Sequence, residues 1–433
     1  MFRKTLVTAL LCGLALAGCG GSDAGTIVSP DSCSIAGQNQ FVLDTMRDVY
    51  LWNDLLPSNV NINAYNSPEA LLAFLTSFQP LDSFSFINTA EADSAFFGEG
   101  QFEGFGFSSR FEAADDLRLT RVFADGPAGR AGFERGQRIV ALDGRSIADI
   151  EAAEGVAAVF DLSPLEFTMR RPDNSEFVVT LTQDVVTIDP LPQWRVIDTG
   201  TAMAGYMELA TFISTADPVF DTIFAEFRQA GVNDVIIDMR YNGGGLVSTA
   251  ELLGDYFGGD VADGLVFSKT LFNGNNTASN RTEFFERQGN SMSLSRLVVI
   301  ATSGTASASE LVTNSMEPHV EVAIVGDTTF GKPVGQLGIT FCEKVLRPTS
   351  FETVNANDEG GYFDGLPVDC AAADDLNVAV GDADDPNVVA ALEYLDTGAC
   401  PAVQTTVAPA ALSEPVPRLD LRGPPWREFA GAF

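Results

Sequence analysis

The hydrophobic positions between residues 187 and 400 follow two alternating patterns. Continuous apolar runs such as "DVIIDMR" and "RLVVIA" are typical of strands that are buried on both faces. Segments with helical spacing of apolar residues separate these strands. The helix predicted to begin at Asp217 and Pro218 places five apolar side chains on one face: Val219, Phe220, Ile223, Phe224 and Phe227. Strands that alternate with helices predict an α/β core with a mostly parallel sheet.

The chain before this core has two other textures. In "FVLDTMRDVYLWNDLLP" and "SPEALLAFLTSF" the apolar residues recur with helical spacing, and Ser67 and Pro68 are a helix cap and a first-turn proline. From about Gln101 to Gln183, short segments alternate apolar and polar residues, as strands do. We therefore expect a small N-terminal helical domain (35–96), a β-domain (97–186), the core (187–400) and an Ala/Pro-rich tail (401–433).

The first 19 residues have the pattern of an export signal. A basic start, "MFRK", precedes an apolar run over residues 6–17 that is too short to span a bilayer. The run ends in "LAGCGGS", which resembles a bacterial lipoprotein signal with Cys19 as the lipidated residue and 20–34 as a linker. We expect export to the bacterial envelope, with a lipid anchor in the periplasm, at the outer membrane. Ordinary signal cleavage beside an incidental cysteine is the alternative.

The charge of the chain argues against a nucleic-acid partner. The formal net charge is −34, and a surface this acidic repels nucleic-acid backbones.

Four cysteines follow the signal: Cys33, Cys342, Cys370 and Cys400. Four cysteines allow three pairings, and Cys342–Cys370 is favoured here because these two bracket one loop-like stretch. No CxxC or Cys/His cluster is present, so we expect no metal site.

A glycine-rich loop opens the predicted β-domain. In "EGFGF", the backbone N–H groups of Phe105, Gly106 and Phe107 can converge on a carboxylate, and the glycines, Gly104 among them, allow close approach. Followed by "DGPAGRAGFERGQRIVALDG", this loop resembles a PDZ domain, which binds peptide C-termini. A β-domain that binds nothing and only spaces its neighbours is the alternative.

Two small-residue turns follow core strands and lead into helices. These are "RYNGGG" and "TSGTASAS", and active sites of open α/β sheets form at such strand ends. A serine there could attack a carbonyl while N–H groups at a helix start hold the oxyanion. Ser303, Ser307 and Ser309 are the candidates that the pattern alone does not separate.

A nucleophilic serine needs a base. The single histidine, His319, is separated from the serine turn by the intervening helix, so it is a poor candidate. Lys332 follows another apolar strand, and burial can lower a lysine pKa enough to make a general base. A surface lysine is the alternative. "GDTTFGK" also has P-loop spacing, but Pro333 stands where the magnesium-binding Ser or Thr would be.

Three segments in this order, "DMRYNGGG" (238–245), "TASASE" (305–310) and "TFGKPVGQ" (329–336), resemble the carboxyl-terminal processing peptidases, also called tail-specific proteases. These are Ser-Lys dyad serine endopeptidases with a PDZ domain. "DSFSFI" (82–87) resembles the segment before that domain. The resemblance implies a ClpP/crotonase-like core and a secreted endopeptidase that needs no cofactor and cleaves protein substrates near C-termini captured by the PDZ domain. The N-terminal signal pattern adds the membrane anchor.

By motif position, the resemblance implies Ser307 as nucleophile, Lys332 as base and Gln336 as the residue that orients the lysine. The amides of Ala308 and Gly244 would form the oxyanion hole. Asp238 and Arg240 would fix the glycine turn, with a surface salt bridge as the alternative. Two other functions remain open: a catalytically inactive, peptide-binding lipoprotein, and a carrier of hydrophobic ligands on the same core.

Overall fold

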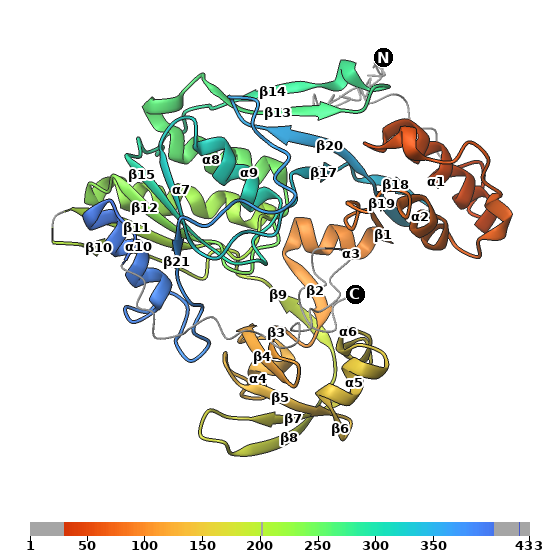
Figure 1. Ribbon diagram of the computed structural model, residues 1–433, viewed down its shortest axis with the longest axis horizontal. Coiled ribbons are helices and arrows are strands. Elements are labelled where there is room, and N and C mark those ends of the chain that lie inside the picture. Colours follow the sequence, from red (N-terminus) through yellow and green to blue (C-terminus); the bar gives the residue numbers. More distant parts are fainter. Residues whose placement is uncertain (1–29, 201, 402–423, 425–433) are drawn as a thin grey trace, which may run out of the picture.

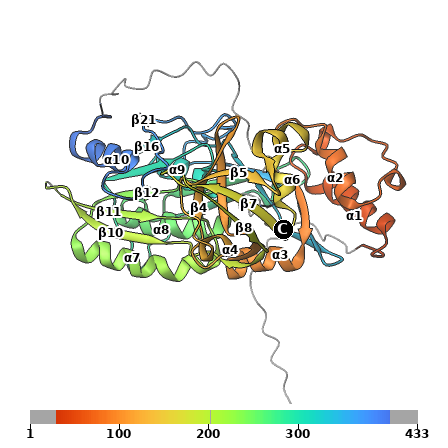
Figure 2. The same cartoon turned by 90° about the horizontal axis from the view of Figure 1, so that it is seen from below.

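The computed structural model describes residues 30–200, 202–401 and 424 (Figures 1 and 2). The predicted signal peptide with Cys19 lies outside these residues, as does nearly all of the predicted tail. Figure 1 shows three parts: the core sheet with its helices, the N-terminal helices beside it, and the β-domain below. Among the described residues, no helix combines the length and apolar character needed to cross a membrane.

A six-stranded sheet lies at the centre of the core, in the order β10-β11-β12-β15-β16-β21. The strands are β10 (Gln193–Asp198), β11 (Met203–Glu208), β12 (Asp234–Asp238), β15 (Arg296–Ala301), β16 (Glu321–Gly326) and β21 (Cys370–Ala371). β10 runs antiparallel to β11, and the other neighbours pair in parallel. The predicted mostly parallel sheet is thereby confirmed.

Helices cover both faces of this sheet. They are α7 (Asp217–Ala230), α8 (Val247–Ala262), α9 (Ala308–Met316) and α10 (Pro386–Thr397). Alternate strand residues face opposite layers: Ile237 and Val299 pack with α7, α8 and α9, whereas Ile236 and Val298 pack with α10. The predicted face of α7 packs on the core: Phe220, Ile223, Phe224 and Phe227 are inaccessible to solvent, and Val219 is partly buried. The carboxyl ends of β12 and β15 therefore open toward the starts of α8 and α9.

The chain that follows Lys332 enters a second sheet, in which all neighbouring strands are antiparallel. Its order is β14-β13-β20-β17, with β13 (Val266–Phe272), β14 (Arg281–Phe284), β17 (Val334–Gln336) and β20 (Thr349–Val354). β17 pairs with β20, and Gln336 lies opposite Thr349. This pairing brings Gln336 to the edge of the sheet that faces the N-terminal segment.

The N-terminal helices α1 (Ile35–Val49) and α2 (Pro68–Thr76) pack on a hairpin from the C-terminal half of the chain. That hairpin consists of β18 (Ile339–Phe341) and β19 (Lys344–Arg347), and β1 (Phe86–Thr89) extends it as a third strand. The Ser67 hydroxyl accepts from the Ala70 N–H at 3.1 Å, which confirms the predicted cap of α2. The helices therefore share one apolar core with residues 339–346.

The disulfides join Cys33 to Cys342 and Cys370 to Cys400, so the favoured Cys342–Cys370 pair is wrong. Cys342 lies in the turn between β18 and β19, and packing of α1 on that hairpin brings Cys33 to it. Cys370 begins β21 and lies beside Cys400, which follows α10. The prediction paired cysteines that are close in sequence. It was wrong because the β18–β19 hairpin packs against α1, near the N-terminus, and so brings Cys342 to Cys33.

The β-domain (residues 101–187) forms a separate layer with its own apolar core. Its elements are β2 (Gln101–Gly104), β3 (Phe107–Ala113), β4 (Asp116–Val122), α4 (Pro127–Arg130), β5 (Arg138–Leu142), β6 (Arg145–Ser146), α5 (Ile147–Ala153), α6 (Val156–Phe160), β7 (Leu165–Arg170), β8 (Glu176–Leu181) and β9 (Asp184–Thr187). β2 pairs with β9, and the main sheet has the order β3-β4-β5-β7-β8. β3 is therefore an edge strand.

The remaining elements are short. They are α3 (Ala90–Ser94), the π-helical turn η3 (Ala95–Glu99), and the 3-10 turns η1 (Asn53–Leu55), η2 (Ile62–Ala64), η4 (Ser214–Ala216) and η5 (Thr277–Ser279). The Ser214 hydroxyl near the start of η4 donates to the backbone carbonyls of Phe97 and Gly98 at 3.2 and 3.1 Å. These bonds tie the segment that enters the β-domain to the core.

Candidate active site

The serine turn places one of the three candidate hydroxyls at the start of α9. Ser307 is the N-cap residue, half-buried, with φ 56° and ψ −112°, a conformation that non-glycine residues rarely adopt. Ser309 is buried and its hydroxyl donates to the Asn242 carbonyl at 3.0 Å. Ser303 is exposed in the preceding loop. The structure thus separates the candidates: Ser309 has a structural bond, and Ser307 has the strained backbone typical of functional sites.

One buried carboxylate ties the serine turn to the lysine loop. Glu310 has no exposed surface and accepts from the backbone N–H groups of Ser307 (2.9 Å), Gly331 (2.7 Å) and Lys332 (2.8 Å) and from the Thr329 hydroxyl (2.5 Å). Ser307 and Lys332 donate to the same oxygen, Oε2, so their nitrogens lie no farther apart than these two bonds together. Burial raises the pKa of Glu310, and the four donors oppose that rise.

Sequence reasoning did not assign a role to Glu310. A signal was present, because Ser307 and Glu310 have the S-x-x-E spacing of a capping box, in which the glutamate returns to the N-cap amide. The capping box predicts only the contact with Ser307. The contacts with the lysine loop come from tertiary packing between segments about 20 residues apart.

The amine of Lys332 lies in a largely desolvated environment. Nζ donates to Gln336 Oε1 at 3.0 Å and lies 5.2 Å from the centroid of the Phe84 ring. Gln336 Nε2 in turn donates to the Phe84 carbonyl at 2.6 Å. Desolvation lowers the pKa of Lys332 to about 8, so about a tenth of the amine is neutral at pH 7 and about half of it at pH 8.

No hydrogen bond joins Ser307 Oγ to Lys332 Nζ in the part of the chain that the structure describes. Catalytic hydrogen bonds are often long in free enzymes and tighten when substrate binds. The backbone segments of Ser307 and Lys332 are held together because both bind Glu310. The long, flexible side chain of Lys332 can then move its amine toward the serine hydroxyl.

The two predicted oxyanion donors differ in availability. Among the described residues, the Ala308 N–H has no protein acceptor, as expected for the first turn of a helix. Gly244 has φ +102°, and a Cβ there would lie 2.7 Å from Ser307 Cβ, so only glycine allows this approach. Its N–H donates to Asn242 Oδ1 at 2.9 Å. Gly244 could therefore stabilise an oxyanion only by sharing or exchanging that bond.

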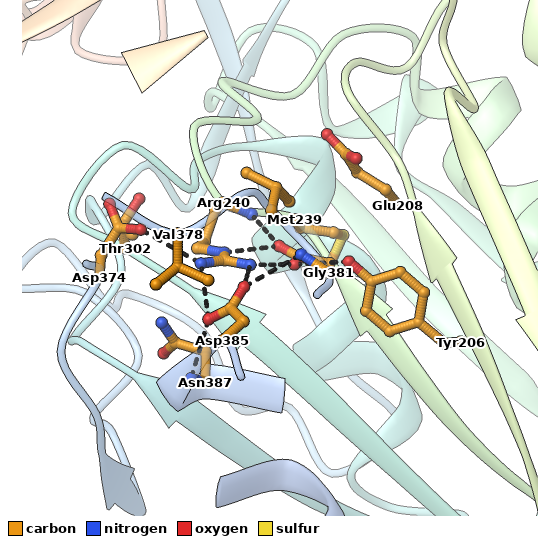
Figure 3. Close-up of polar contacts among 12 residues, drawn as sticks. Tyr206, Glu208, Met239, Arg240, Thr302, Asp374, Val378, Gly381, Asp385 and Asn387 are labelled. Carbon is orange, nitrogen blue, oxygen red and sulfur yellow. Dashed lines mark hydrogen bonds and ion pairs between the residues drawn. The ribbon is translucent and has the colours of Figure 1, made fainter. Parts of the chain in front are cut away.

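A buried charge cluster surrounds Arg240, the first residue of the "RYNGGG" turn (Figure 3). Arg240, only 1% exposed, contacts Asp238 at 2.6 Å, Asp385 at 2.5 Å and Asp374 at 3.1 Å. The Tyr206 hydroxyl donates to Asp238 Oδ2 at 2.9 Å. The surface salt bridge considered for Asp238 and Arg240 is thereby excluded, because both side chains are buried.

The β-domain docks on this same cluster. Arg135 donates to Asp374 Oδ1 at 2.6 Å and to the Tyr241 hydroxyl at 2.8 Å, and Arg110 also pairs with Asp374. Burial alone would raise the pKa of Asp374, but the guanidinium groups hold it below its usual value. Tyr241 belongs to the glycine turn and has φ 62°. Contact with the β-domain therefore reaches the backbone that neighbours Gly244.

The predicted carboxylate-binding loop lies between β2 and β3. Phe105 and Phe107 are fully buried in the β-domain core, so their side chains fold the loop. Gly106 has φ +82°, and a Cβ there would lie 3.0 Å from Gly126 Cα. Together with Gly104 at the end of β2, these residues place a backbone loop directly before the edge strand β3.

His319 has a structural environment. Its Nε2 lies 2.9 Å from the Val266 carbonyl, and its ring packs edge-on against Phe285. This agrees with the prediction that His319 does not serve the serine turn. Among the described residues, no group of three or more His, Cys, Asp or Glu side chains could hold a metal ion.

Two family models match the segments that form this site. The model for peptidase family S41 matches residues 203–364, and the model for the peptidase S41 N-terminal domain matches residues 37–86. The first match includes the glycine turn, Ser307, Glu310 and Lys332. The second includes the segment that contacts Gln336 and Lys332.

Curated relatives agree with this assignment. A chloroplastic C-terminal processing peptidase of Tetradesmus obliquus is 28% identical over 330 residues, covering 69% of this chain and 64% of that protein. A carboxyl-terminal-processing protease of Synechocystis sp. is 24% identical over 247 residues, covering 54% and 53%. The chain thus spans less than two thirds of the length of these relatives.

Solved structures show the same fold. A Bacteroides fragilis protein assigned to the S41 proteases aligns with TM-score 0.65 at 20% identity, covering 82% of this chain and 97% of that one. The photosystem II D1 C-terminal processing protease aligns with TM-score 0.53 at 21% identity, covering 79% and 94%. Two regions of the chain therefore match domains of peptidase family S41, and the chain is a homologue of the C-terminal processing proteases.

Proposed function

We propose that the protein is a serine endopeptidase that cleaves protein substrates near their C-termini with a Ser307–Lys332 dyad. The observation that carries this proposal is the single buried Glu310 oxygen that binds the backbone amides of both residues. The lowered pKa of Lys332, about 8, supplies the base that the serine needs.

In the proposed reaction, neutral Lys332 takes the proton of the Ser307 hydroxyl as Oγ attacks the scissile carbonyl. The Ala308 N–H donates to the developing oxyanion, and Gly244 joins it when its bond to Asn242 is shared. The Lys332 ammonium then protonates the leaving amine, and an ester forms on Ser307. A water then gives its proton to Lys332 and attacks the ester carbonyl. Lys332 passes this proton to the departing Ser307 Oγ, which restores the serine and the neutral amine and releases the carboxylic acid product.

The β-domain is proposed to act as a PDZ domain that captures the substrate C-terminus. The loop from Gly104 to Phe107 supports this role, as does β3, which pairs only with β4 among the described strands, because a peptide can add to such an edge as a further strand. We further propose that the protein is exported and anchored through lipidated Cys19, as the N-terminal sequence pattern predicts. Proteins with free C-termini would be its substrates.

This function is tested by hydrolysis of an unstructured polypeptide prepared with a free or an amidated C-terminus. We expect the purified protein to cleave the free form and to lose about tenfold to a hundredfold in kcat/KM on the amidated form, because charge-assisted hydrogen bonds to the carboxylate are lost. Ser307→Ala is the inactive control. Tight binding without Ser307-dependent cleavage would support the peptide-binding lipoprotein instead, and binding of a fluorescent lipid without cleavage would support the hydrophobic carrier.

A further inference from the structure

Phe84, in the N-terminal region, contacts the proposed base Lys332 through Gln336. Gln336 Nε2 donates to the Phe84 carbonyl at 2.6 Å, and Gln336 Oε1 accepts from Lys332 Nζ at 3.0 Å. A primary amide has a donor end and an acceptor end. Because the Phe84 carbonyl accepts from the donor end, it fixes the acceptor end toward Lys332.

Asp82 fixes the Phe84 carbonyl in turn. Its Oδ1 accepts from the N–H groups of Phe84 and Ser85, each at 3.0 Å, and its Oδ2 accepts from the Ser85 hydroxyl at 2.7 Å. An aspartate that binds amides two and three residues ahead locks the local backbone as a turn. The orientation of the peptide after Phe84 therefore depends on the Asp82 side chain.

The turn is also tied to the core. The Thr349 hydroxyl donates to Asp82 Oδ1 at 3.0 Å, and the Thr349 N–H donates to the Ser85 hydroxyl at 2.9 Å. Thr349 begins β20, the strand that pairs with β17 and lies opposite Gln336. A continuous series of hydrogen bonds thus runs from Thr349 through Asp82, the Phe84 peptide and Gln336 to the amine of Lys332.

We infer that Asp82 is a positioning residue for the general base, acting through the Phe84 carbonyl and Gln336 to set the direction of the Lys332 amine. This inference rests on the proposed Ser307–Lys332 chemistry. A neutral amine that donates one hydrogen to Gln336 keeps its lone pair for the proton of the serine. An amine without that fixed partner samples other directions, and misplacement by about 1 Å can cost about a hundredfold in rate.

Asp82 also carries charge near the amine. Desolvation lowers the pKa of Lys332, the carboxylates of Asp82 and Glu310 partly oppose this fall, and the Arg347 guanidinium adds to it. Asp82→Asn should therefore lower that pKa, because the amide carries no charge, while its single oxygen can still accept from Phe84, Ser85 and Thr349. Asp82→Ala removes both the charge and the turn.

The test compares Asp82→Ala, Asp82→Asn and Asp255→Asn with the wild-type protein in the peptide cleavage assay across pH. Asp255 is a matched control because it is a half-buried carboxylate that accepts from a backbone N–H, that of Glu286 at 2.7 Å, and from the Gln288 amide. We expect Asp82→Ala to lower kcat by about tenfold to a hundredfold with KM nearly unchanged. Asp82→Asn should recover most of kcat at pH 9, with its acidic limb moved to lower pH.

The inference would be overturned if Asp82→Ala kept the wild-type kcat. It would also be overturned if, in Asp82→Asn, the rise of kcat on the acidic side of the pH profile stayed at the wild-type pH. If Asp82→Ala does not fold, the pH limb of Asp82→Asn decides alone. Asp255→Asn should leave both kcat and the limb unchanged, since its contacts involve no active-site residue. Cleavage that survives Ser307→Ala would contradict the proposed function as well, whereas Ser307-dependent cleavage that is insensitive to Asp82 would contradict this inference only.

Discussion

Lys332→Met is expected to lower kcat/KM by about 10⁴-fold without loss of folded structure. The substitution removes the proposed general base, the amine that Gln336 orients, so the attacking hydroxyl keeps its proton. Methionine is apolar and of similar length, so it suits a site that already disfavours charge, as the lowered pKa of Lys332 shows. Steady-state cleavage and thermal unfolding measure the two effects separately.

Lys332→Arg is the control that keeps a positive charge at this position but cannot accept a proton. Arginine stays protonated at all accessible pH values, so it preserves a cation near Gln336 and cannot accept the serine proton. We expect it to be as inactive as Lys332→Met. Retention of more than about a tenth of wild-type kcat/KM by either variant would show that another group deprotonates the nucleophile.

Glu310→Gln is expected to lower both activity and stability. Within the described residues, four donors and no acceptor face this carboxyl group, an arrangement that favours its charged form against the effect of burial. A glutamine offers one oxygen, and its NH₂ group would face N–H donors of the serine turn or of the lysine loop. Leaving buried donors unpaired costs about 1–3 kcal/mol each, so we expect a loss of about 3 kcal/mol in the free energy of unfolding.

The activity loss for Glu310→Gln is expected to be about a hundredfold or more, because Ser307 and Lys332 would no longer share one anchor. Glu251→Gln is the control. Glu251 lies on α8, desolvation raises its pKa to about 7, and it pairs with Arg281. We expect this control to retain wild-type activity. Denaturant titration and steady-state kinetics give the comparison, and a Glu310→Gln variant that matches Glu251→Gln in both would refute the anchoring role.

The elements of the core could be predicted because their signals are local. The apolar stripe of α7 and the continuous strands β12 and β15 appear directly in the sequence. The two small-residue turns follow those strands, so topology alone brings them to one sheet edge. Chain order also excluded His319, which lies in the turn after α9 and contacts the Val266 carbonyl.

The contacts that complete the site could not be predicted, because long-range packing creates them. Phe84 and Gln336 are 252 positions apart in the chain, and they meet because β1 pairs with β19. The Cys33–Cys342 disulfide depends on the same packing of the N-terminal helices on the β18–β19 hairpin. No periodicity or spacing in either segment carries information about the other.

The account depends most directly on a neutral Lys332 that activates Ser307. Covalent labelling with a fluorophosphonate, followed by peptide mass spectrometry, measures this in the free protein. The account predicts modification of Ser307, at a rate that rises with pH and has its inflection near the Lys332 pKa of about 8. Lys332→Met should abolish this pH-dependent labelling. Modification of Ser303 or Ser309 instead, or unchanged labelling of Ser307 in Lys332→Met, would contradict the account.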